Sequence, residues 1–238
     1  PTIAMVGLVD DEKHITTQWF KNAGDAIILI GTVAGVGDPG RDGANHVSYL
    51  GGSQFLKVCH GKKIGPPPHV NLAHEINIQN AVRALIREGL VESAHDCSEG
   101  GLAVAVAECC FNPDHLLGAN VDLTCSHGPV GRPGQTCHRH VATALFNESQ
   151  SRIVISVGPE NLEKTMSILS AGRTDSSRGE RERGIPFQKL GQVGRQELHI
   201  RTNDEDLRWP IADLYDDWWN AIRRAVESDS SAERIPSL

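Results

Sequence analysis

The pattern of apolar positions predicts one buried strand and several flanking ones. Residues 26–30 read AIILI, introduced by Gly24-Asp25 and closed by Gly31. An uninterrupted apolar run of this length is typical of a strand that is covered on both faces, so we expect it near the centre of a sheet. Further strands are predicted at residues 3–9, 90–96, 153–157, 185–194 and 197–201.

Apolar residues that recur every three to four positions predict helices between these strands. The clearest helix begins after Asn71, an N-cap residue, and ends at Gly89. Other helices are predicted at 54–61, at 101–110, with Pro159 in a first turn, and at 211–226. The residues expected to face the core are Leu72, Ile76, Val82, Leu85 and Ile86 in the clearest helix, and Leu214, Trp218, Ile222 and Ala225 in the last one.

The order of these elements predicts the fold class. About six strands and four or five helices follow one another in mixed order and without internal repeats. This order indicates an α/β protein of the α+β type, in which helices cover a layered mixed sheet. Residues 112–144 are expected to be irregular, the charged segment 171–184 to be a mobile linker, and the tail 228–238 to be disordered.

Composition narrows the classes of function. The 238 residues carry a formal net charge of −7, which argues against nucleic acid or an anionic membrane surface as the main partner. No apolar run reaches the roughly 18 residues of a membrane span, and the N-terminus has no signal-peptide pattern, so the expected setting is the cytoplasm. The six cysteines form no regular framework and are expected to be reduced thiols.

The start of the chain bears on its domain organisation. It reads PTIAMVGLVDD, without an initiator methionine and with a predicted strand at 3–9 for which no earlier segment supplies a partner. We therefore expect the sequence to be cut from a longer protein. Trimming of the terminus is the other interpretation.

A dense group of polar residues precedes the alanine-rich helix in the stretch AHDCSEGGLAVAVAE, residues 94–108. Gly100 and Gly101 allow a sharp bend into that helix, whose first backbone N–H groups and dipole favour an anion. His95, Asp96 and Ser98 lie just before the bend and could bind a metal, a ribose or a phosphate. The stretch therefore predicts a ligand-facing turn, and a solvated connection between two elements is the alternative.

A second group combines thiol and imidazole side chains within the irregular region. Such ligands could hold zinc, but their spacing matches no standard finger or ribbon, and glycines and prolines separate them. We interpret the group as a solvated loop, with a structural metal as the alternative. Its members are Cys125, His127, Cys137, His138 and His140.

Four segments together carry a resemblance to a known family. In chain order they read AMVGLVDD, LGGSQFLK, IREGLVESAHDCSEGGLAVAVAE and LFNESQSRIVISV. They resemble the C-terminal part of the synthetase subunit in the phosphoribosylformylglycinamidine synthase family, which is related to aminoimidazole ribonucleotide synthase. The resemblance implies that residues 1–22 are the last strand and linker of an upstream N-terminal-type domain, that 23–227 form an aminoimidazole ribonucleotide synthase C-terminal-like domain, and that 228–238 are a tail.

The resemblance also implies a reaction of de novo purine biosynthesis. ATP phosphorylates the formamide oxygen of formylglycinamide ribonucleotide, and ammonia from a glutaminase subunit displaces the phosphate to give formylglycinamidine ribonucleotide. The implied ligands are ATP or ADP with Mg²⁺ and the ribonucleotide substrate. The family's catalytic residues and principal magnesium carboxylates belong to upstream domains, so no catalytic or metal-binding residue is assigned to this chain, which is expected to be inactive alone.

The same resemblance assigns roles to two clusters. His95, Asp96, Ser98, Gly100 and Gly101 are expected to form one wall of a phosphate pocket, in either the catalytic or an auxiliary nucleotide site. The other cluster is expected to contact substrate or to serve the auxiliary site or a domain interface; it comprises Glu148, Ser149 and Gln150.

Three expectations remain open at this level. Arg152 could pair with a phosphate, but we favour a role in bracing Glu148. The insertion at 125–140 and the charged segment around 176–183 depart from the family pattern. The alternative function is a non-catalytic module of the same fold that binds a nucleotide or assembles subunits.

Overall fold

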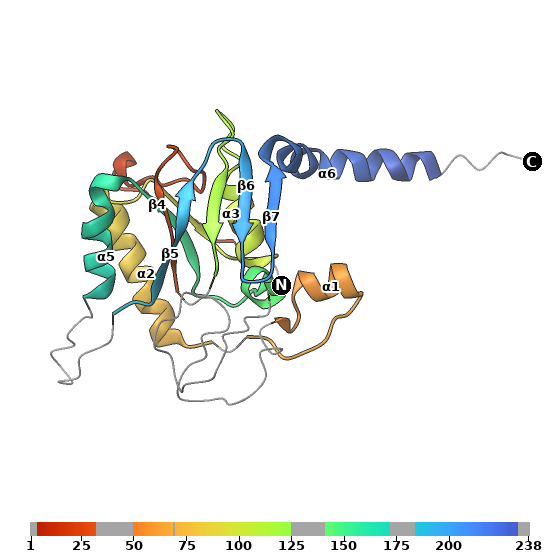
Figure 1. The fold of residues 1–238 in the computed structure, drawn as a ribbon. Helices are drawn as coiled ribbons and strands as arrows, with labels where there is room; N and C mark the ends of the chain where they lie inside the picture. The colour runs from red at the N-terminus through yellow and green to blue at the C-terminus, as the bar shows by residue number, and fades with distance from the viewer. Residues whose placement is uncertain (1–3, 32–49, 69, 125–140, 172–183, 233–238) are drawn as a thin grey trace, which may run out of the picture.

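One mixed sheet organises the computed structural model, which describes residues 4–31, 50–68, 70–124, 141–171 and 184–232 (Figure 1). In this described part the sheet has seven strands in the order β2-β4-β1-β5-β3-β6-β7. β3 and β6 are parallel, and the other neighbouring strands are antiparallel. The strands are β1 (Ala26–Ile30), β2 (Ser93–Asp96), β3 (Ala119–Asp122), β4 (Ile153–Val157), β5 (Phe187–Val193), β6 (Glu197–Arg201) and β7 (Asp206–Pro210).

Helices cover both faces of this sheet. Alternate residues of β1 point to opposite faces. Ile28 and Ile30 belong to a cluster with buried residues of α2 (Leu72–Arg87) and α5 (Leu162–Ser170). Ile27 and Leu29 belong to a second cluster with residues of α3 (Gly101–Cys109) and α4 (Val141–Phe146). The remaining helices are α1 (Gln54–His60), α6 (Ile211–Ala232) and the short 3-10 turns Glu12–His14 and Pro159–Asn161.

The sequence predicted the centre of the fold correctly. All five residues of β1 are buried, and the strand pairs with both β4 and β5. The expected α+β class with a mixed sheet is confirmed. Asn71 caps α2 by accepting the backbone N–H of His74, and Gly89 follows the helix with a positive φ of 64°.

Several predicted elements were wrong, for identifiable reasons. Residues 4–9 form no strand, and they lie exposed without a neighbouring strand to pair with. Residues 112–144 are not irregular throughout, because β3 and the start of α4 fall within them. β3 was missed because it is only four residues long. β7 was missed because most of its residues are exposed. The charged segment 172–183 lies outside the described residues.

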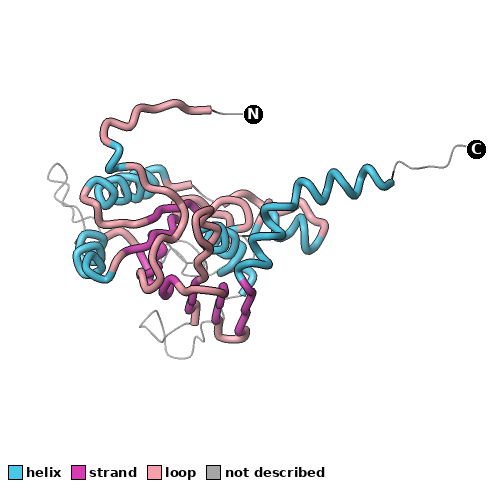
Figure 2. Tube along the Cα trace, turned by 90° about the horizontal axis from the view of Figure 1, so that it is seen from above, coloured by secondary structure: helices cyan, strands magenta, loops and turns pink. Residues whose placement is uncertain are grey.

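The predicted buried faces of α2 and α6 are confirmed only in part, by Val82 and Leu85 in α2 and by Leu214 in α6. In α2, Leu72 and Ile76 are 70% and 57% exposed, while Ile78 is fully buried. In α6, Ile222 is 82% exposed, because the helix runs past the end of the sheet and away from the body (Figure 2). The helix also continues to Ala232, so disorder does not describe the first residues of the predicted tail.

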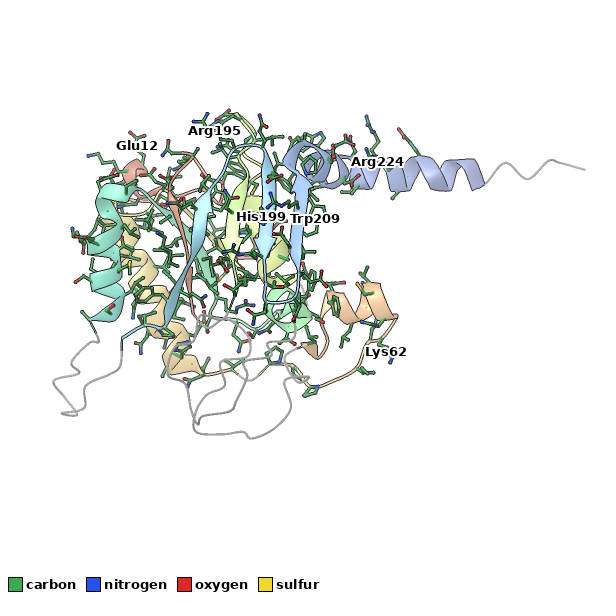
Figure 3. The ribbon with its side chains drawn as sticks, in the orientation of Figure 1. Glu12, Lys62, Arg195, His199, Trp209 and Arg224 are labelled. Carbon is green, nitrogen blue, oxygen red and sulfur yellow. The ribbon has the colours of Figure 1, made fainter. Side chains whose placement is uncertain are left out.

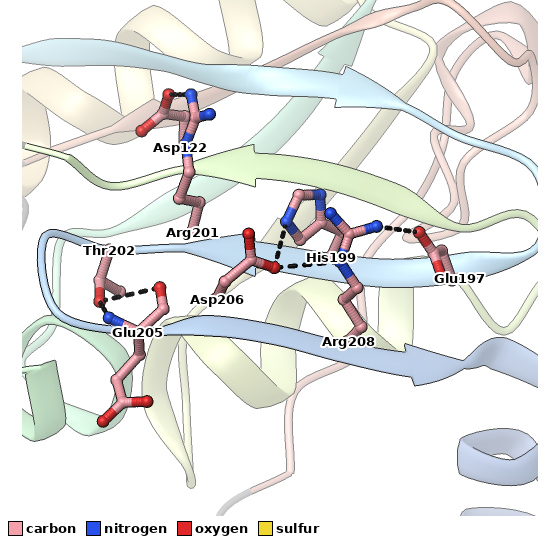
Figure 4. Close-up of polar contacts among 8 residues, drawn as sticks. All are labelled: Asp122, Glu197, His199, Arg201, Thr202, Glu205, Asp206 and Arg208. Atoms are coloured by element: carbon pink, nitrogen blue, oxygen red, sulfur yellow. Dashed lines mark hydrogen bonds and ion pairs between the residues drawn. The ribbon is translucent and has the colours of Figure 1, made fainter.

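Polar side chains connect β3, β6 and β7 across the strands (Figure 4). Arg201 pairs with Asp122, and Arg208 donates to Glu197 at 2.9 Å and to Asp206 at 3.0 Å. Burial raises the pKa of Asp122, but hydrogen bonds from Arg201 and Thr124 outweigh it and bring that pKa to about 2. The network therefore ties the outer strands β6 and β7 to the sheet.

We expect Asp122→Asn to remove a stabilising contribution that depends on pH. Because the pKa of the folded carboxyl lies below its ordinary value of 3.8, the contribution is fully present above that value and is lost as pH falls through about 2. The side chain is 41% exposed, so solvent screening limits the effect to about 1 kcal/mol or less. Urea unfolding at pH 6 and pH 3 should show the difference between wild type and variant shrinking at the lower pH, and a constant difference would contradict this assignment.

Candidate functional site

The predicted glycine bend connects β2 to α3 and is closely packed. Gly100 and Gly101 both have left-handed backbones, with φ of 81° and 64°. A Cβ atom on Gly101 would lie 2.5 Å from the carbonyl oxygen of Asn147, and one on Gly100 would lie 2.3 Å from the side chain of Val104. Close approach of α3 to the segment after α4 therefore requires glycine here, whether or not a ligand binds.

The polar residues before the bend differ in their exposure to solvent. His95 Nε2 lies 2.8 Å from Glu108 Oε2, so the imidazole packs against α3 and its side chain is only 15% exposed. Ser98 Oγ donates to Asp96 Oδ2 at 2.6 Å, and the Asp96 side chain is 71% exposed. Asp96 and Ser98 are thus open to a ligand from solvent, whereas His95 is held by Glu108.

Glu148 joins the two clusters that the sequence singled out. Its Oε1 accepts the backbone N–H of Gly100 and the backbone N–H of Gln54, each at 2.8 Å. The first contact lies at the N-terminal bend of α3 and the second at the first residue of α1, so one carboxylate receives amides from both helix starts. The predicted anion position beside Gly100 therefore already holds a negative group of the chain itself.

The residues around Glu148 are fixed by their own contacts. Ser149 donates its backbone N–H to Asn147 Oδ1 at 2.8 Å, and Gln150 is partly buried. Ser151 has a positive φ of 64°, and its hydroxyl bonds to Glu75 of α2. Non-glycine residues rarely adopt this backbone, so surrounding contacts must hold it in place. Sequence reasoning missed Glu75 because nothing in the α2 pattern marks a partner 76 residues away.

Arg152 is buried and contacts the backbone that precedes Glu148. It is 2% exposed, and its Nη1 donates to the backbone carbonyl of Asn147 at 2.6 Å. Among the described residues its Nε and Nη2 have no hydrogen-bond partner, and it makes no bond to the Glu148 carboxylate. Burial lowers the pKa of Arg152, and the nearby Cys97 opposes that effect. Arg152 thus braces the backbone just before Glu148 and not the Glu148 carboxylate itself.

Cys97, Cys109 and Cys110 are buried, which disfavours their thiolate forms. Burial raises the pKa of Cys97 to about 11 despite the favourable charge of Arg152, and burial also raises the pKa of Cys109 and Cys110. These three and the exposed Cys59 are free thiols, as predicted. The described residues contain no group of three possible metal ligands, and the predicted zinc cluster at 125–140 lies outside them.

Comparison with known proteins places this geometry in a family. The family model described as "AIR synthase related protein, C-terminal domain" matches residues 22–177. The chain belongs to this family. The matched range of the AIR synthase related domain includes β1, both predicted clusters and α5. No described helix of this domain is long and apolar enough to cross a membrane.

Two curated relatives of this AIR synthase related chain share one name. "Phosphoribosylformylglycinamidine synthase subunit PurL" of Anaeromyxobacter sp. strain Fw109-5 is 36% identical over 229 residues, covering 96% of this chain and 26% of the relative. The protein of the same name from Alkaliphilus metalliredigens strain QYMF is 34% identical with the same coverage. The chain therefore spans about a quarter of the length of these relatives.

Solved structures confirm the fold of this AIR synthase related chain. Thermotoga maritima PurL complexed with ATP matches with a TM-score of 0.56 and 16% identity, over 86% of this chain and 28% of that one. The same protein complexed with FGAR matches with a TM-score of 0.56 and 20% identity, over 86% and 30%. At these identities the matches establish shared architecture.

Replacing Glu148 with alanine should destabilise the fold. The change removes the acceptor of two partly buried amides, at Gly100 and Gln54, and should lower the free energy of unfolding by about 1–3 kcal/mol. Glu148→Gln keeps an acceptor oxygen and should cost less. Glu99→Ala removes an exposed neighbouring carboxylate and is the matched control. Equal urea midpoints for the Glu148→Ala and Glu99→Ala proteins would contradict the bridging role of Glu148.

Proposed function

We propose that this chain is a C-terminal part of an ATP-dependent carbon–nitrogen ligase that makes formylglycinamidine ribonucleotide. The observation that carries the proposal is the 36% identity to a phosphoribosylformylglycinamidine synthase subunit over 96% of the chain. The substrates are formylglycinamide ribonucleotide, ATP and glutamine-derived ammonia. These are small polar molecules of de novo purine biosynthesis, and a cytoplasmic setting suits them.

The role of this chain in that reaction is to bind nucleotide or phosphate. The first turn of α3 lies beside the exposed side chains of Asp96 and Ser98, while the Gly100 and Gly101 N–H groups of the bend donate to Glu148 and to the Ser98 carbonyl. First-turn amides of an α-helix have no acceptor within the helix, and its dipole favours an anion there. The Gly100 N–H donates to the Glu148 carboxylate, so a phosphate would bind at this amide only by displacing Glu148. Ser149 and Gln150 lie next to this contact and are proposed to face the substrate or an auxiliary nucleotide.

Mg²⁺ fits this site only together with a nucleotide. The described residues offer no cluster of three metal ligands, but Mg²⁺ commonly uses one or two carboxylates plus phosphate oxygens. Asp96 is the exposed carboxylate at the bend and would supply one such oxygen. When bound, Mg²⁺ neutralises phosphate charge. The α3 amides would hold the phosphate, and Asp96 would act on it only through the ion, because two anions repel each other.

The catalytic residues are proposed to lie in upstream domains of the synthetase, and a glutaminase subunit supplies ammonia. Residues 23–227 form the domain, preceded by a linker at 1–22. PurL relatives are about four times longer than the matched region, so they are long enough to carry such upstream domains. A solved structure named PurLQS from Thermotoga maritima supports the involvement of further subunits.

Calorimetric titration of the chain with Mg-ADP tests the nucleotide site. We expect binding by wild type, and about tenfold weaker binding by Asp96→Ala and Ser98→Ala, each of which removes one polar contact to the bound nucleotide. Glu163→Gln, on the exposed side of α5, is the control and should bind as wild type does. A folded wild-type chain that gives no heat with Mg-ADP would contradict a complete nucleotide site on this domain. A separate titration with formylglycinamide ribonucleotide would show whether the Glu148 cluster contacts substrate.

The chain alone should not catalyse the ligase reaction. Incubation with ATP, formylglycinamide ribonucleotide and ammonia should release no phosphate above the rate without protein, because the phosphate-binding residues described here include no catalytic group. A phosphate-release assay measures this directly. Turnover by the chain, abolished by Asp96→Ala, would show that catalytic residues lie within these 238 positions.

A further inference from the structure

The helix α1 is held at the edge of the molecule by the segment that contains Glu148. None of its residues, Gln54–His60, all of which the structure describes, is buried, and the helix lies apart from the sheet (Figure 1). Lys62, just beyond its C-terminal end, lies far from the sheet (Figure 3). A helix with so little buried surface belongs to the part of a protein that opens at low cost in free energy.

Two neighbouring residues at the start of α1 contact residues 146–148. Phe55 stacks on Phe146, with ring centroids 4.9 Å apart and an angle of 11° between the ring planes. Gln54 donates its backbone N–H to Glu148 Oε1 at 2.8 Å. This N–H belongs to the first turn of the helix, where it has no acceptor within the helix itself. The start of α1 is therefore tied to the body by a carboxylate, and an aromatic stack supports that contact.

One oxygen atom of Glu148 serves the starts of two helices. Oε1 accepts the N–H of Gly100 as well as that of Gln54, each at 2.8 Å. A phosphate oxygen at the Gly100 amide would take the position of this atom, and two anionic oxygens so close together repel each other. Because the same atom accepts both N–H groups, Glu148 cannot leave Gly100 and keep its contact with Gln54 unchanged.

We propose that α1 is a gate that opens when the phosphate group of a nucleotide binds at the α3 bend. Displacement of Glu148 from Gly100 also removes the acceptor of the Gln54 N–H, so the Phe55–Phe146 stack holds α1 with less support. The helix then separates from the bend more readily. This gate rests on the nucleotide site proposed above, since the phosphate of that nucleotide is the anion that displaces Glu148.

Thermodynamic linkage makes the coupling reciprocal. If the ligand releases α1, a substitution that releases α1 must strengthen ligand binding. Gln54→Pro is such a substitution, because proline lacks the N–H that Glu148 accepts and fits the first position of a helix. Ser53, the preceding residue, has φ −68° and ψ 155°, which is the extended conformation that a following proline favours. Gln54→Ala keeps the N–H and is the matched control.

Calorimetric titration of the complete chain with Mg-ADP compares these two variants. Gln54→Pro should bind about tenfold more tightly than wild type, the factor expected of one hydrogen bond to a charged group, because one amide fewer then holds Glu148 in place. Gln54→Ala should bind as wild type does. Equal affinities of the two variants for Mg-ADP overturn the proposal.

Hydrogen exchange followed by mass spectrometry measures the opening of α1 directly. Saturating Mg-ADP should raise the exchange rate of the α1 amides about tenfold, and Gln54→Pro should do so without ligand, while the α5 amides keep their wild-type rate. Heat of binding without any change in α1 exchange overturns the gate and leaves the nucleotide site in place. No heat from a folded wild-type chain contradicts the nucleotide site itself, and it overturns the gate as well, because no ligand then displaces Glu148.

Discussion

Burial of β1 on both faces is the constraint on which the rest of the molecule depends. Every residue of this strand is shielded from water, and each face of it belongs to a different apolar cluster. A strand buried in this way needs a hydrogen-bonded neighbour on each edge and a helical layer on each side, because unpaired backbone groups are costly away from water. β4, β5 and the helices α2, α3 and α5 meet those requirements.

The candidate site follows from where β1 ends. A Cβ atom on Gly31, the residue after β1, would lie 2.2 Å from the carbonyl oxygen of Ser151. The segment before β4 therefore packs closely against the end of β1. Within that segment, the buried Arg152 donates a hydrogen bond to the backbone carbonyl of Asn147. This packing brings Glu148 to the α3 bend. One carboxylate can bridge two helix starts because the core fixes both of them.

Sequence reasoning reached the parts of the fold that depend on local pattern. Neighbouring residues alone predict the apolar run of β1, the cap at Asn71 and the glycine bend. The structure contains all three. The contacts of Glu148, Arg152 and Ser151 join residues from distant parts of the chain, so no local pattern encodes them. The exposed face of α6 escaped prediction for the opposite reason. Its apolar spacing is that of a buried helix, and spacing alone does not say whether the face is buried.

The Glu148 contact also changes how the glycine bend should be understood. Glycines here satisfy close packing, because a Cβ atom on Gly101 would meet the backbone of 145–147. A glycine-rich bend is therefore necessary for the fold even without a ligand. The feature of the bend that is open to a ligand is the exposed pair Asp96 and Ser98. A phosphate that approaches this bend must share its amides with Glu148 or displace it. In the nucleotide site that we propose, the strength of the Glu148 bridge would therefore limit the affinity for phosphate.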